Sequence, residues 1–293
     1  MHQVQGSLLC FGRQMILIAD SGSTKTDWCI ADEGRIVKRM ATQGLNPFHQ
    51  SLDTIAQVIN DELLPQLDDR DMVHVERLHF YGSGCRAEML PRITELFTFL
   101  FPGTDVECQG DLMAAARAVC GSSEGIACIL GTGSNSCLYD GERVVENVPP
   151  LGYILGDEGS GAVMGRLFFN ALYKGRLDDR LRSDYEQATG LIMADVIDHV
   201  YRQPLANRFL ASACPFIAKH LDNSSLHALV VDNFRQFFRR NVLRYERTDL
   251  RAGAIGSVAY YFEKQLCEAA ALEGVNIGTV VRSPMEGLVH YHC

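Results

Sequence analysis

The chain uses one strand–loop–strand pattern twice, and this repeat constrains its fold more than any other feature. Residues 16–37 and 126–145 each run from an apolar strand through a tight loop of Gly, Ser and Thr into a second strand. An acidic turn with glycine follows in both, and then arginine and β-branched residues. Because apolar runs joined by short polar turns form antiparallel strand pairs, the repeat predicts two related half-domains.

The rest of the chain alternates between apolar, strand-like runs and helical patterns. Further strands are predicted over 75–81, 104–108, 250–255 and 278–282. Helices are predicted over 51–67, from 85 to about 100, from Asp111, over 158–174, through much of 178–249, from Gly256 to about Leu272 and from Ser283. Each half then contains antiparallel hairpin strands followed by strand–helix units. This order predicts an α/β fold with a helix-covered mixed sheet in each half.

The length of the chain limits the number of domains, and its net charge limits the kinds of binding partner. The 293 residues suffice for two domains. We expect an N-terminal extension over 1–14, a first domain over 15–114 with a returning helix over 284–293, and a second domain over 115–283. The net charge of −9 argues against nucleic acid as the main partner, although it leaves room for a local nucleotide pocket.

Apolar runs and cysteines indicate the compartment. No apolar run reaches membrane-spanning length, and no basic region precedes the short apolar patch near the start. Most of the ten cysteines lie in or beside apolar elements, and none forms a C-x-x-C pair. They are typical of small core residues in a reducing compartment. We expect a cytoplasmic protein with no membrane partner.

The first hairpin loop, Ser21–Thr26, has the chemistry of a phosphate site. Glycine lets the backbone approach an anion closely, and N–H groups and hydroxyls can converge on it. Thr24 and Lys25 can contact phosphate oxygens, and Asp20 can hold Mg²⁺ through water beside a bound triphosphate. A turn-capping aspartate and solvated loop residues remain the alternative. The loop does not match the G-x-x-x-x-G-K-[ST] pattern.

Two other acidic positions stand at predicted strand-to-helix junctions. Asp111 follows Gly110 and opens a helix, where a carboxylate can accept a proton from a substrate hydroxyl or cap the helix. Asp157 lies in the run Gly156–Gly161, where it can accept a hydrogen bond from a sugar hydroxyl. Acidic residues also complement the dipole of a helix start, so a structural role stays open for both.

Two weaker patterns point to other site types. Gly82–Ala87 fits a loose G-x-G-x-x-A, and Glu107 lies near the spacing of a ribose-binding acid. A dinucleotide site is disfavoured, because this unit comes after a hairpin rather than opening the domain. His290 and His292 do not share a helix face, which disfavours a terminal metal site.

Four segments together resemble a known family. They are D-S-G-S-T-K-T-D from Asp20, L-G-T-G-S-N-S from Leu130, G-D-E-G-S-G from Gly156 and G-S-V-A-Y-Y from Gly256. In this order they are similar to the BadF/BadG/BcrA/BcrD ATPase-type family. That family includes N-acetylglucosamine kinases and belongs to the actin-like and hexokinase ATPase superfamily. The resemblance covers nearly the whole chain from Met15.

The resemblance implies two ribonuclease-H-like domains with a cleft between them, and it implies roles for particular residues. Asp111 matches the catalytic aspartate, and Asp20 matches the residue near Mg²⁺. Gly256 and Ser257 match the adenosine motif. The implied sugar-binding residues are Asn46, Thr132, Asn135 and Asp157. The implied phosphate-binding residues of ATP are Ser21, Gly22, Ser23, Thr24, Lys25, Thr26, Gly131, Thr132, Gly133 and Ser134.

These residues predict an ATP-dependent kinase that phosphorylates N-acetylglucosamine or a related amino sugar at the 6-hydroxyl. The resemblance to kinases that are often dimers makes a homodimer one expectation, and the sequence itself leaves the oligomeric state open. The segment Leu151–Leu155 departs from the tryptophan-containing pattern of the animal kinases, which leaves the exact amino sugar open. Two alternatives from other classes remain. One is a regulatory ATPase of the activator type, and the other is a non-catalytic sugar sensor on the same fold.

Overall fold

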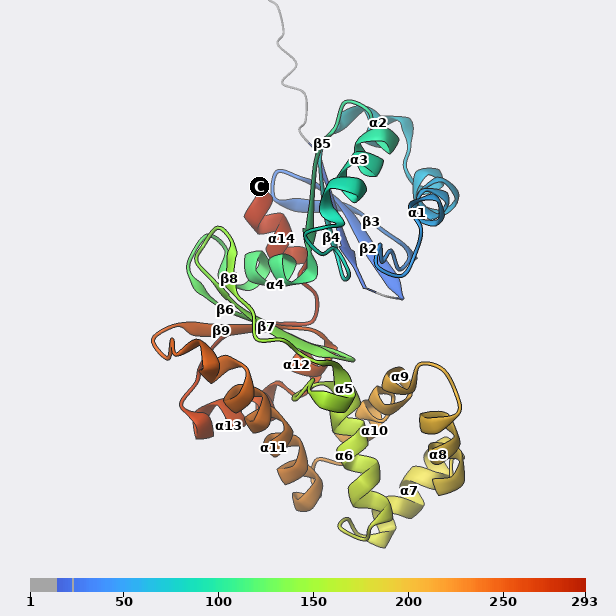
Figure 1. Ribbon diagram of the computed structural model, residues 1–293, viewed down its shortest axis with the longest axis vertical. Coiled ribbons are helices and arrows are strands. Elements are labelled where there is room, and N and C mark those ends of the chain that lie inside the picture. Colours follow the sequence, from blue (N-terminus) through green and yellow to red (C-terminus); the bar gives the residue numbers. More distant parts are fainter. Residues whose placement is uncertain (1–14, 23) are drawn as a thin grey trace, which may run out of the picture. The chain divides into compact units, whose positions relative to one another are not determined.

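The computed structural model describes residues 15–22 and 24–293 (Figure 1). These residues form two compact units. One comprises the described residues up to Ala114 together with Leu288–Cys293, and the other comprises Ala115–Gly287. Each unit encloses its own hydrophobic core. The extension expected over 1–14 lies outside the described residues.

The first unit is built on a mixed sheet with the strand order β3-β2-β1-β4-β5. Strands β1, β2 and β3 are antiparallel neighbours, whereas β4 and β5 run parallel to β1. The strands are β1 (Met15–Ser21), β2 (Lys25–Asp32), β3 (Arg35–Gln43), β4 (Val75–Gly82) and β5 (Asp105–Gly110). The sequence predicted all five, with ends differing by a few residues.

The turn between β2 and β3 and the aromatic core explain why this sheet forms. Glu33 and Gly34 take φ angles of 47° and 74°, and the type I′ two-residue hairpin turn requires positive φ at both central positions. Beneath the sheet, the ring centroid of Trp28 lies 6.2 Å from those of Phe80 and Phe97. Tilted and edge-on aromatic pairs of this kind add to the stabilisation from burial.

The helices of the first unit include one segment that changes type along its length. Ser51 caps it by accepting a hydrogen bond from the Thr54 N–H. The chain then runs as α1 (Leu52–Val58), a π-helical turn η1 (Ile59–Leu63) and a 3₁₀ turn η2 (Leu64–Gln66). The predicted extent is confirmed, although one uniform helix was expected. The remaining helices are α2 (Asp69–His74), which was not predicted, and α3 (Leu90–Leu100).

The second unit repeats the strand order of the first. Its sheet runs β10-β9-β6-β7-β8, so the first two strands form a hairpin, a third joins antiparallel, and two later strands add in parallel. The strands are β6 (Gly125–Leu130), β7 (Ser134–Tyr139), β8 (Val144–Glu146), β9 (Arg251–Ile255) and β10 (Asn276–Val281). The relation inferred from the repeated hairpin is therefore confirmed at the level of sheet topology.

Helices occupy most of the second unit between its third and fourth strands. They are α5 (Gly152–Leu155), α6 (Gly161–Tyr173), α7 (Asp179–Thr189), α8 (Met193–Tyr201), α9 (Ala206–Ala211), α10 (Cys214–Lys219), α11 (Ser224–Arg240) and the 3₁₀ turn η3 (Val242–Tyr245). After β9 come α12 (Ser257–Tyr261) and α13 (Glu263–Glu273). Helix α11 packs on α13, and Arg235 and Arg239 each lie 2.6 Å from the Glu273 carboxylate.

Two predicted helix boundaries in this unit were wrong for physical reasons. Helix α6 begins at Gly161 rather than at Glu158, because the Ser160 hydroxyl caps it by accepting from the Val163 N–H. The helix expected from Gly256 to about Leu272 is broken at Phe262, which has a non-helical backbone and is fully buried.

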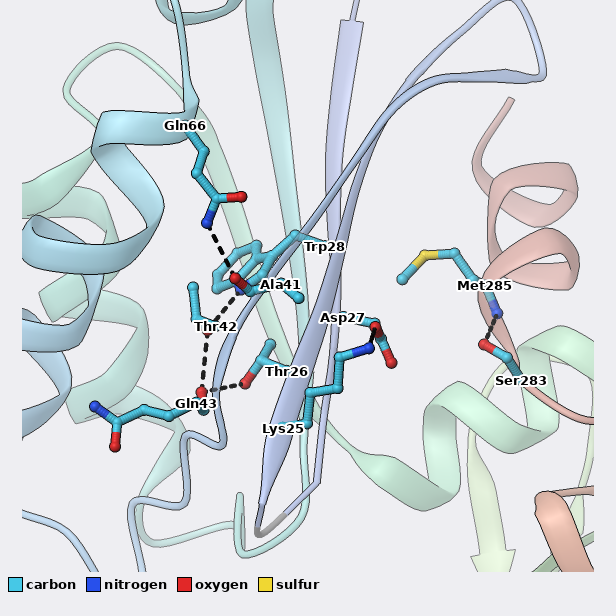
Figure 2. A network of polar contacts seen from close by, with 10 residues as sticks. All are labelled: Lys25, Thr26, Asp27, Trp28, Ala41, Thr42, Gln43, Gln66, Ser283 and Met285. Carbon is cyan, nitrogen blue, oxygen red and sulfur yellow. Dashed lines mark hydrogen bonds and ion pairs between the residues drawn. The ribbon is translucent and has the colours of Figure 1, made fainter.

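Helix α4 (Asp111–Cys120) and helix α14 (Met285–His292) each contribute residues to both units. The N–H of Met285 donates to the Ser283 hydroxyl at 3.3 Å, so this serine marks the start of α14 as predicted (Figure 2). In the described part of the chain, no helix has both the length and the apolar character to cross a membrane. The nine cysteines in that part are all free thiols.

Candidate active site

The loop between β1 and β2 leaves its tip exposed. Ser21 and Thr26 form the last pair of the β1–β2 ladder, and the Gly22 N–H donates to the Lys25 carbonyl at 3.0 Å. Gly22, Thr24 and Lys25 are exposed, and the Lys25 ammonium pairs with Asp27 at 2.5 Å. Ser23 lies outside the described residues. The exposed tip thus offers backbone, hydroxyl and ammonium groups to an anion.

The hydroxyls of Ser21 and Thr26 serve the fold. Both side chains are buried, and their oxygens lie 2.6 Å apart. Ser21 Oγ also bonds the carbonyl oxygen and the N–H of Leu45, at 2.9 and 3.0 Å. Thr26 Oγ1 donates to the Gln43 carbonyl at 3.2 Å, beside the similar bond from Thr42 (Figure 2). The side-chain oxygens of both residues are therefore engaged within the protein.

The bonds from Ser21 also position the segment that carries Asn46. Asn46 is buried, and its N–H donates to the Gln50 side chain at 2.7 Å while its side-chain oxygen accepts from the Phe48 N–H at 3.0 Å. The chain passes close to it at Gly84, where φ is +83° and a Cβ would lie 2.1 Å from that side-chain oxygen. The glycine at position 84 is therefore explained by close packing on Asn46. No dinucleotide-binding role is required to account for the glycine pattern over 82–87.

Two half-buried carboxylates belong to the first unit. Asp20 is next to last in β1, and Asp111 is the first residue of α4, directly after β5. Burial raises the pKa of Asp20 to about 7, with further increases from the charges of Asp111 and Asp27. Burial also raises the pKa of Asp111, against hydrogen bonds from the N–H groups of Leu112 and of Asp111 itself. Like charges held together in this way favour a proton or a cation.

The second hairpin loop is held by backbone hydrogen bonds within its own unit. The Gly131 N–H donates to the Gly133 carbonyl at 2.9 Å. The carbonyls of Gly131 and Thr132 accept from the first N–H groups of α6, those of Gly161 and Ala162, at 2.8 and 3.0 Å. A Cβ at Gly131 would meet no atom within 4 Å. Hydrogen bonds to the start of α6 therefore hold the loop in place, and the space next to the Gly131 Cα atom is free of other atoms of the protein.

Asp157 and Asn135 lie beside this loop. Asp157 has a φ of 51°, which is uncommon for a residue with a side chain. Burial raises its pKa to about 6, against hydrogen bonds from the N–H groups of Ser134 and Gly152. The Asn135 side-chain oxygen accepts from the Asn147 side chain and from the Ser136 N–H, both at 2.9 Å. Part of the hydrogen-bonding capacity of both residues is therefore used within the protein.

Gly256 occupies a position that excludes any larger residue. Its φ is +117°, and a Cβ there would lie 2.3 Å from the Leu130 carbonyl oxygen. Its N–H donates to the Val281 carbonyl at 3.0 Å. This close approach ties the start of α12 to the end of β6 and leaves Ser257 exposed at the first position of the helix.

A pocket of about 550 Å³ opens in the second unit where Thr132 and Ser257 lie. Most of its wall is apolar, which suits the flat face of a purine base, while hydroxyl side chains such as those of Thr132 and Ser257 suit a sugar–phosphate end. Its other lining residues are Ala211, Ser212, Cys214, Pro215, Ala218, Lys219, Val258, Tyr261 and Phe262.

The sequence reasoning missed the residues that helices α9 and α10 bring to this pocket. No motif marks that segment, and only Pro215 at the start of α10 indicates a helix boundary. A second pocket, of about 640 Å³, is lined by Tyr153, Phe169 and Met193 among others, and none of the predicted site residues lines it. The 550 Å³ pocket is therefore the better candidate for a nucleotide.

Comparisons with known proteins assign the family. No family model matches the chain, and no curated protein is found to be similar to it. A proposed N-acetylglucosamine kinase from Porphyromonas gingivalis is 50% identical, with a TM-score of 0.91 over 95% of this chain and 98% of that one. A proposed N-acetylglucosamine kinase from Chromobacterium violaceum is 16% identical, with a TM-score of 0.69 over 96% and 99% of the two chains.

Proteins with other names share only the fold with this chain. The ethanolamine utilization protein EutJ from Carboxydothermus hydrogenoformans has a TM-score of 0.52 at 13% identity, over 94% of this chain and 89% of that one. The family assignment therefore depends on the 50% identity over nearly the full length of both chains. On that ground the chain belongs to the N-acetylglucosamine kinase-like carbohydrate kinases of the BadF/BadG/BcrA/BcrD ATPase type, in the actin-like ATPase superfamily.

Proposed function

We propose that this protein transfers the γ-phosphoryl group of ATP to the 6-hydroxyl of N-acetylglucosamine or a closely related amino sugar. Its class is that of the ATP-dependent carbohydrate kinases. The observation that carries the choice of substrate is the 50% identity, over 98% of its length, to the proposed N-acetylglucosamine kinase of P. gingivalis.

In this proposal Asp111 accepts the proton of the sugar hydroxyl. It stands at the start of α4, immediately after a sheet strand, and is half-buried. Its pKa is raised by burial, and a base works best when its pKa lies near the working pH. A positioned general base contributes about 10²–10⁴-fold to the rate. Phosphoryl transfer otherwise depends mainly on alignment and charge stabilisation.

The carboxylates of the first unit fit a magnesium ion. Magnesium prefers oxygen ligands and keeps several waters, so one or two carboxylates suffice. Asp20 meets this requirement, because its ionised form is disfavoured by burial and by the charges of Asp111 and Asp27, which a cation would offset. When bound, the ion would neutralise charge on the ATP phosphates. The chain's own part is to hold the Asp20 carboxylate at the end of β1.

The proposal divides nucleotide and sugar recognition among several groups. The 550 Å³ pocket with Ser257 takes the adenosine, and the two hairpin loops take the phosphates. In the first loop these contacts come from Gly22, Ser23, Thr24 and Lys25 and from the backbone of Ser21 and Thr26. In the second they come from Gly131, Thr132, Gly133 and Ser134. Asn46, Thr132, Asn135 and Asp157 hold the sugar.

A substrate panel tests the proposal. Purified protein is mixed with MgATP and N-acetylglucosamine, glucosamine, N-acetylmuramic acid or the 6-deoxy analogue of N-acetylglucosamine, and ADP and sugar phosphate are both measured. We expect sugar-dependent ADP formation with matching sugar phosphate, except with the 6-deoxy analogue, which lacks the acceptor hydroxyl. ADP release that is independent of sugar would instead indicate a regulatory ATPase. Sugar binding without any ADP would indicate a sensor.

Assembly and location complete the proposal. We propose a homodimer that works in the cytoplasm, where the nine free thiols of the described residues would stay reduced. Light scattering coupled to size-exclusion chromatography measures the mass in solution. A mass near that of one 32.5 kDa chain at micromolar concentration would contradict the dimer.

A further inference from the structure

The 640 Å³ pocket of the second unit contains none of the groups assigned to the kinase reaction. Helices α6 and α8 supply most of its wall, and α5 and α9 add the rest. Pockets of about 300–1,000 Å³ with mostly apolar walls and a few polar groups are typical of small-molecule sites. The lining residues are Tyr153, Ile154, Arg166, Phe169, Asn170, Tyr173, Lys174, Met193, Val196, Ile197, Val200, Tyr201 and Leu210.

The apolar side chains of this pocket include a buried floor and an exposed rim. Phe169, Val196 and Leu210 are buried and form the floor. Apolar side chains that cluster on the surface of a soluble protein mark a place where something binds. A ligand with an apolar body would therefore rest on the floor and cover the rim. The exposed rim residues are Ile154, Met193, Ile197 and Tyr201, with exposed fractions of 68%, 47%, 50% and 80%.

The two main walls make the pocket elongated. Along α6 the lining residues run from Arg166 to Lys174, and along α8 they run from Met193 to Tyr201. With a rise of 1.5 Å per residue, each wall is about 12 Å long. The lining positions recur every three or four residues, so they lie on one face of each helix. This outline favours an extended apolar chain over a compact ring system.

The wall on α6 carries two cations that the described residues leave without an acidic partner. Arg166 and Lys174 are exposed, and neither side chain has a hydrogen bond or an ion pair within residues 15–22 and 24–293. On the neighbouring helix α7, by contrast, the Arg182 guanidinium lies 3.0 Å from the Glu186 carboxylate. No lining residue is acidic, and the Asn170 amide stands one turn from each cation. The charge of this wall therefore complements an anion.

We propose that this pocket binds one elongated apolar carboxylate of medium chain length. The chain lies between α6 and α8 on the buried floor, and the carboxylate meets the Arg166 guanidinium or the Lys174 ammonium. Hydrogen bonds between such cations and a carboxylate are among the strong ones in proteins. The inference does not depend on sugar phosphorylation, because no residue of this site is assigned to that reaction.

Calorimetric titration of the full-length protein with octanoate, without nucleotide or sugar, tests this inference. We expect saturable binding of one octanoate per chain. Butyrate has four fewer methylene groups to bury, so it should bind at least about tenfold more weakly. Octanol has the same chain without the charge, and it should also bind more weakly than octanoate.

Variants of exposed residues then locate the ligand without disturbing a core. Arg166→Gln combined with Lys174→Gln should weaken octanoate binding at least about tenfold and leave octanol binding unchanged. Ile197→Ser, on the rim, should weaken the binding of both ligands. Arg176→Gln is the matched control, because Arg176 is exposed just after α6 and does not line the pocket; its affinity should equal that of the wild type.

Three other outcomes would overturn the inference. The first is no saturable binding by the wild type, several octanoates per chain, or equal affinity in all variants. The second is a loss of binding in Lys219→Gln but not in the double variant, which would place octanoate in the 550 Å³ pocket. The third is a wild type that binds no octanoate while Ile197→Ser turns a dimer into a monomer, which would assign this face to a second copy of the chain.

Discussion

Among single residues, Asp111 has the position and the burial of a proton acceptor, and removing its charge tests that role directly. We expect Asp111→Asn to lower kcat by at least about 10²-fold, the lower end of what a general base contributes. Its affinity for ADP should stay near that of the wild type, because the amide keeps the size of the side chain. Steady-state kinetics and calorimetry measure the two quantities.

A control on β5, the strand that precedes Asp111, separates this effect from a change in fold. Asp105 is exposed at the start of β5, and Asp105→Asn should keep wild-type turnover. Near-normal kcat in Asp111→Asn would remove this residue from the mechanism. A parallel loss of ADP affinity would assign it to binding instead.

Asp20 makes the stability of the first unit depend on pH. Its pKa is raised from 3.8 to about 7, mainly by burial and then by Asp111. Between these values the native protein holds a proton that the unfolded chain has released. The free energy of unfolding therefore falls as pH rises through this window, by roughly 1.4 kcal/mol per pH unit for a single group.

Asp20→Asn removes this titration, since the amide stays neutral. We expect the variant to be more stable than the wild type at pH 8 in EDTA, by on the order of 2 kcal/mol. The difference should shrink toward pH 5, where the wild-type carboxyl is also protonated. Trp28, the one tryptophan of the chain, is buried in this unit and reports its unfolding in urea. Glu88→Gln, at an exposed position, is the control; a pH-independent difference for Asp20→Asn would refute the argument.

At the scale of elements, two glycines close to the second loop should respond in opposite ways to an added methyl group. A Cβ at Gly256 would lie 2.3 Å from the Leu130 carbonyl oxygen, at a φ of +117°. We expect Gly256→Ala to lower the free energy of unfolding of the second unit by at least about 2 kcal/mol. Circular dichroism, dominated by the helices of that unit, measures the loss.

Gly131→Ala is the contrasting variant. A Cβ there meets no atom within 4 Å, so the protein alone should tolerate it and the melting temperature should be unchanged. If phosphates approach this backbone closely, the methyl group should raise the KM for ATP roughly tenfold, equivalent to about 1.4 kcal/mol. An unchanged KM would exclude close approach of the nucleotide to Gly131.

The same elements show what the sequence could predict. The repeated hairpin predicted both sheets, because each depends on local alternation and turn residues such as Asp32–Gly34. The apolar wall of the 550 Å³ pocket could not be predicted, since α9, α10 and α12 meet there through tertiary packing. Nor could composition show that the hydroxyls of Ser21 and Thr26 are buried in internal hydrogen bonds. A loop rich in hydroxyls looks the same in sequence whether they face a ligand or the protein.

Taken as a whole, the molecule has two hydrophobic cores, each contained in one unit. The candidate nucleotide pocket is lined by the second unit alone, whereas Asp20 and Asp111 belong to the first. Ligands that bind one unit should stabilise that unit by mass action, by about 2.7 kcal/mol at one hundred times Kd. Cooperative units can unfold with different free energies within one chain. If the unfolding of each unit is followed separately, the unit that a ligand stabilises can therefore be identified.

We expect ADP in EDTA to raise the urea midpoint seen by circular dichroism, while the midpoint of Trp28 fluorescence moves little. Adding magnesium and N-acetylglucosamine should then raise the Trp28 midpoint as well, because Asp20, Asn46 and Asp111 are in its unit. Asp20→Asn should weaken this second shift and leave the first intact. Equal shifts of both signals with ADP alone would mean that the two units unfold as one. A Trp28 response confined to the complete set of ligands would instead mean that ADP alone stabilises mainly the second unit, and that the first unit is stabilised only when magnesium and the sugar are also present.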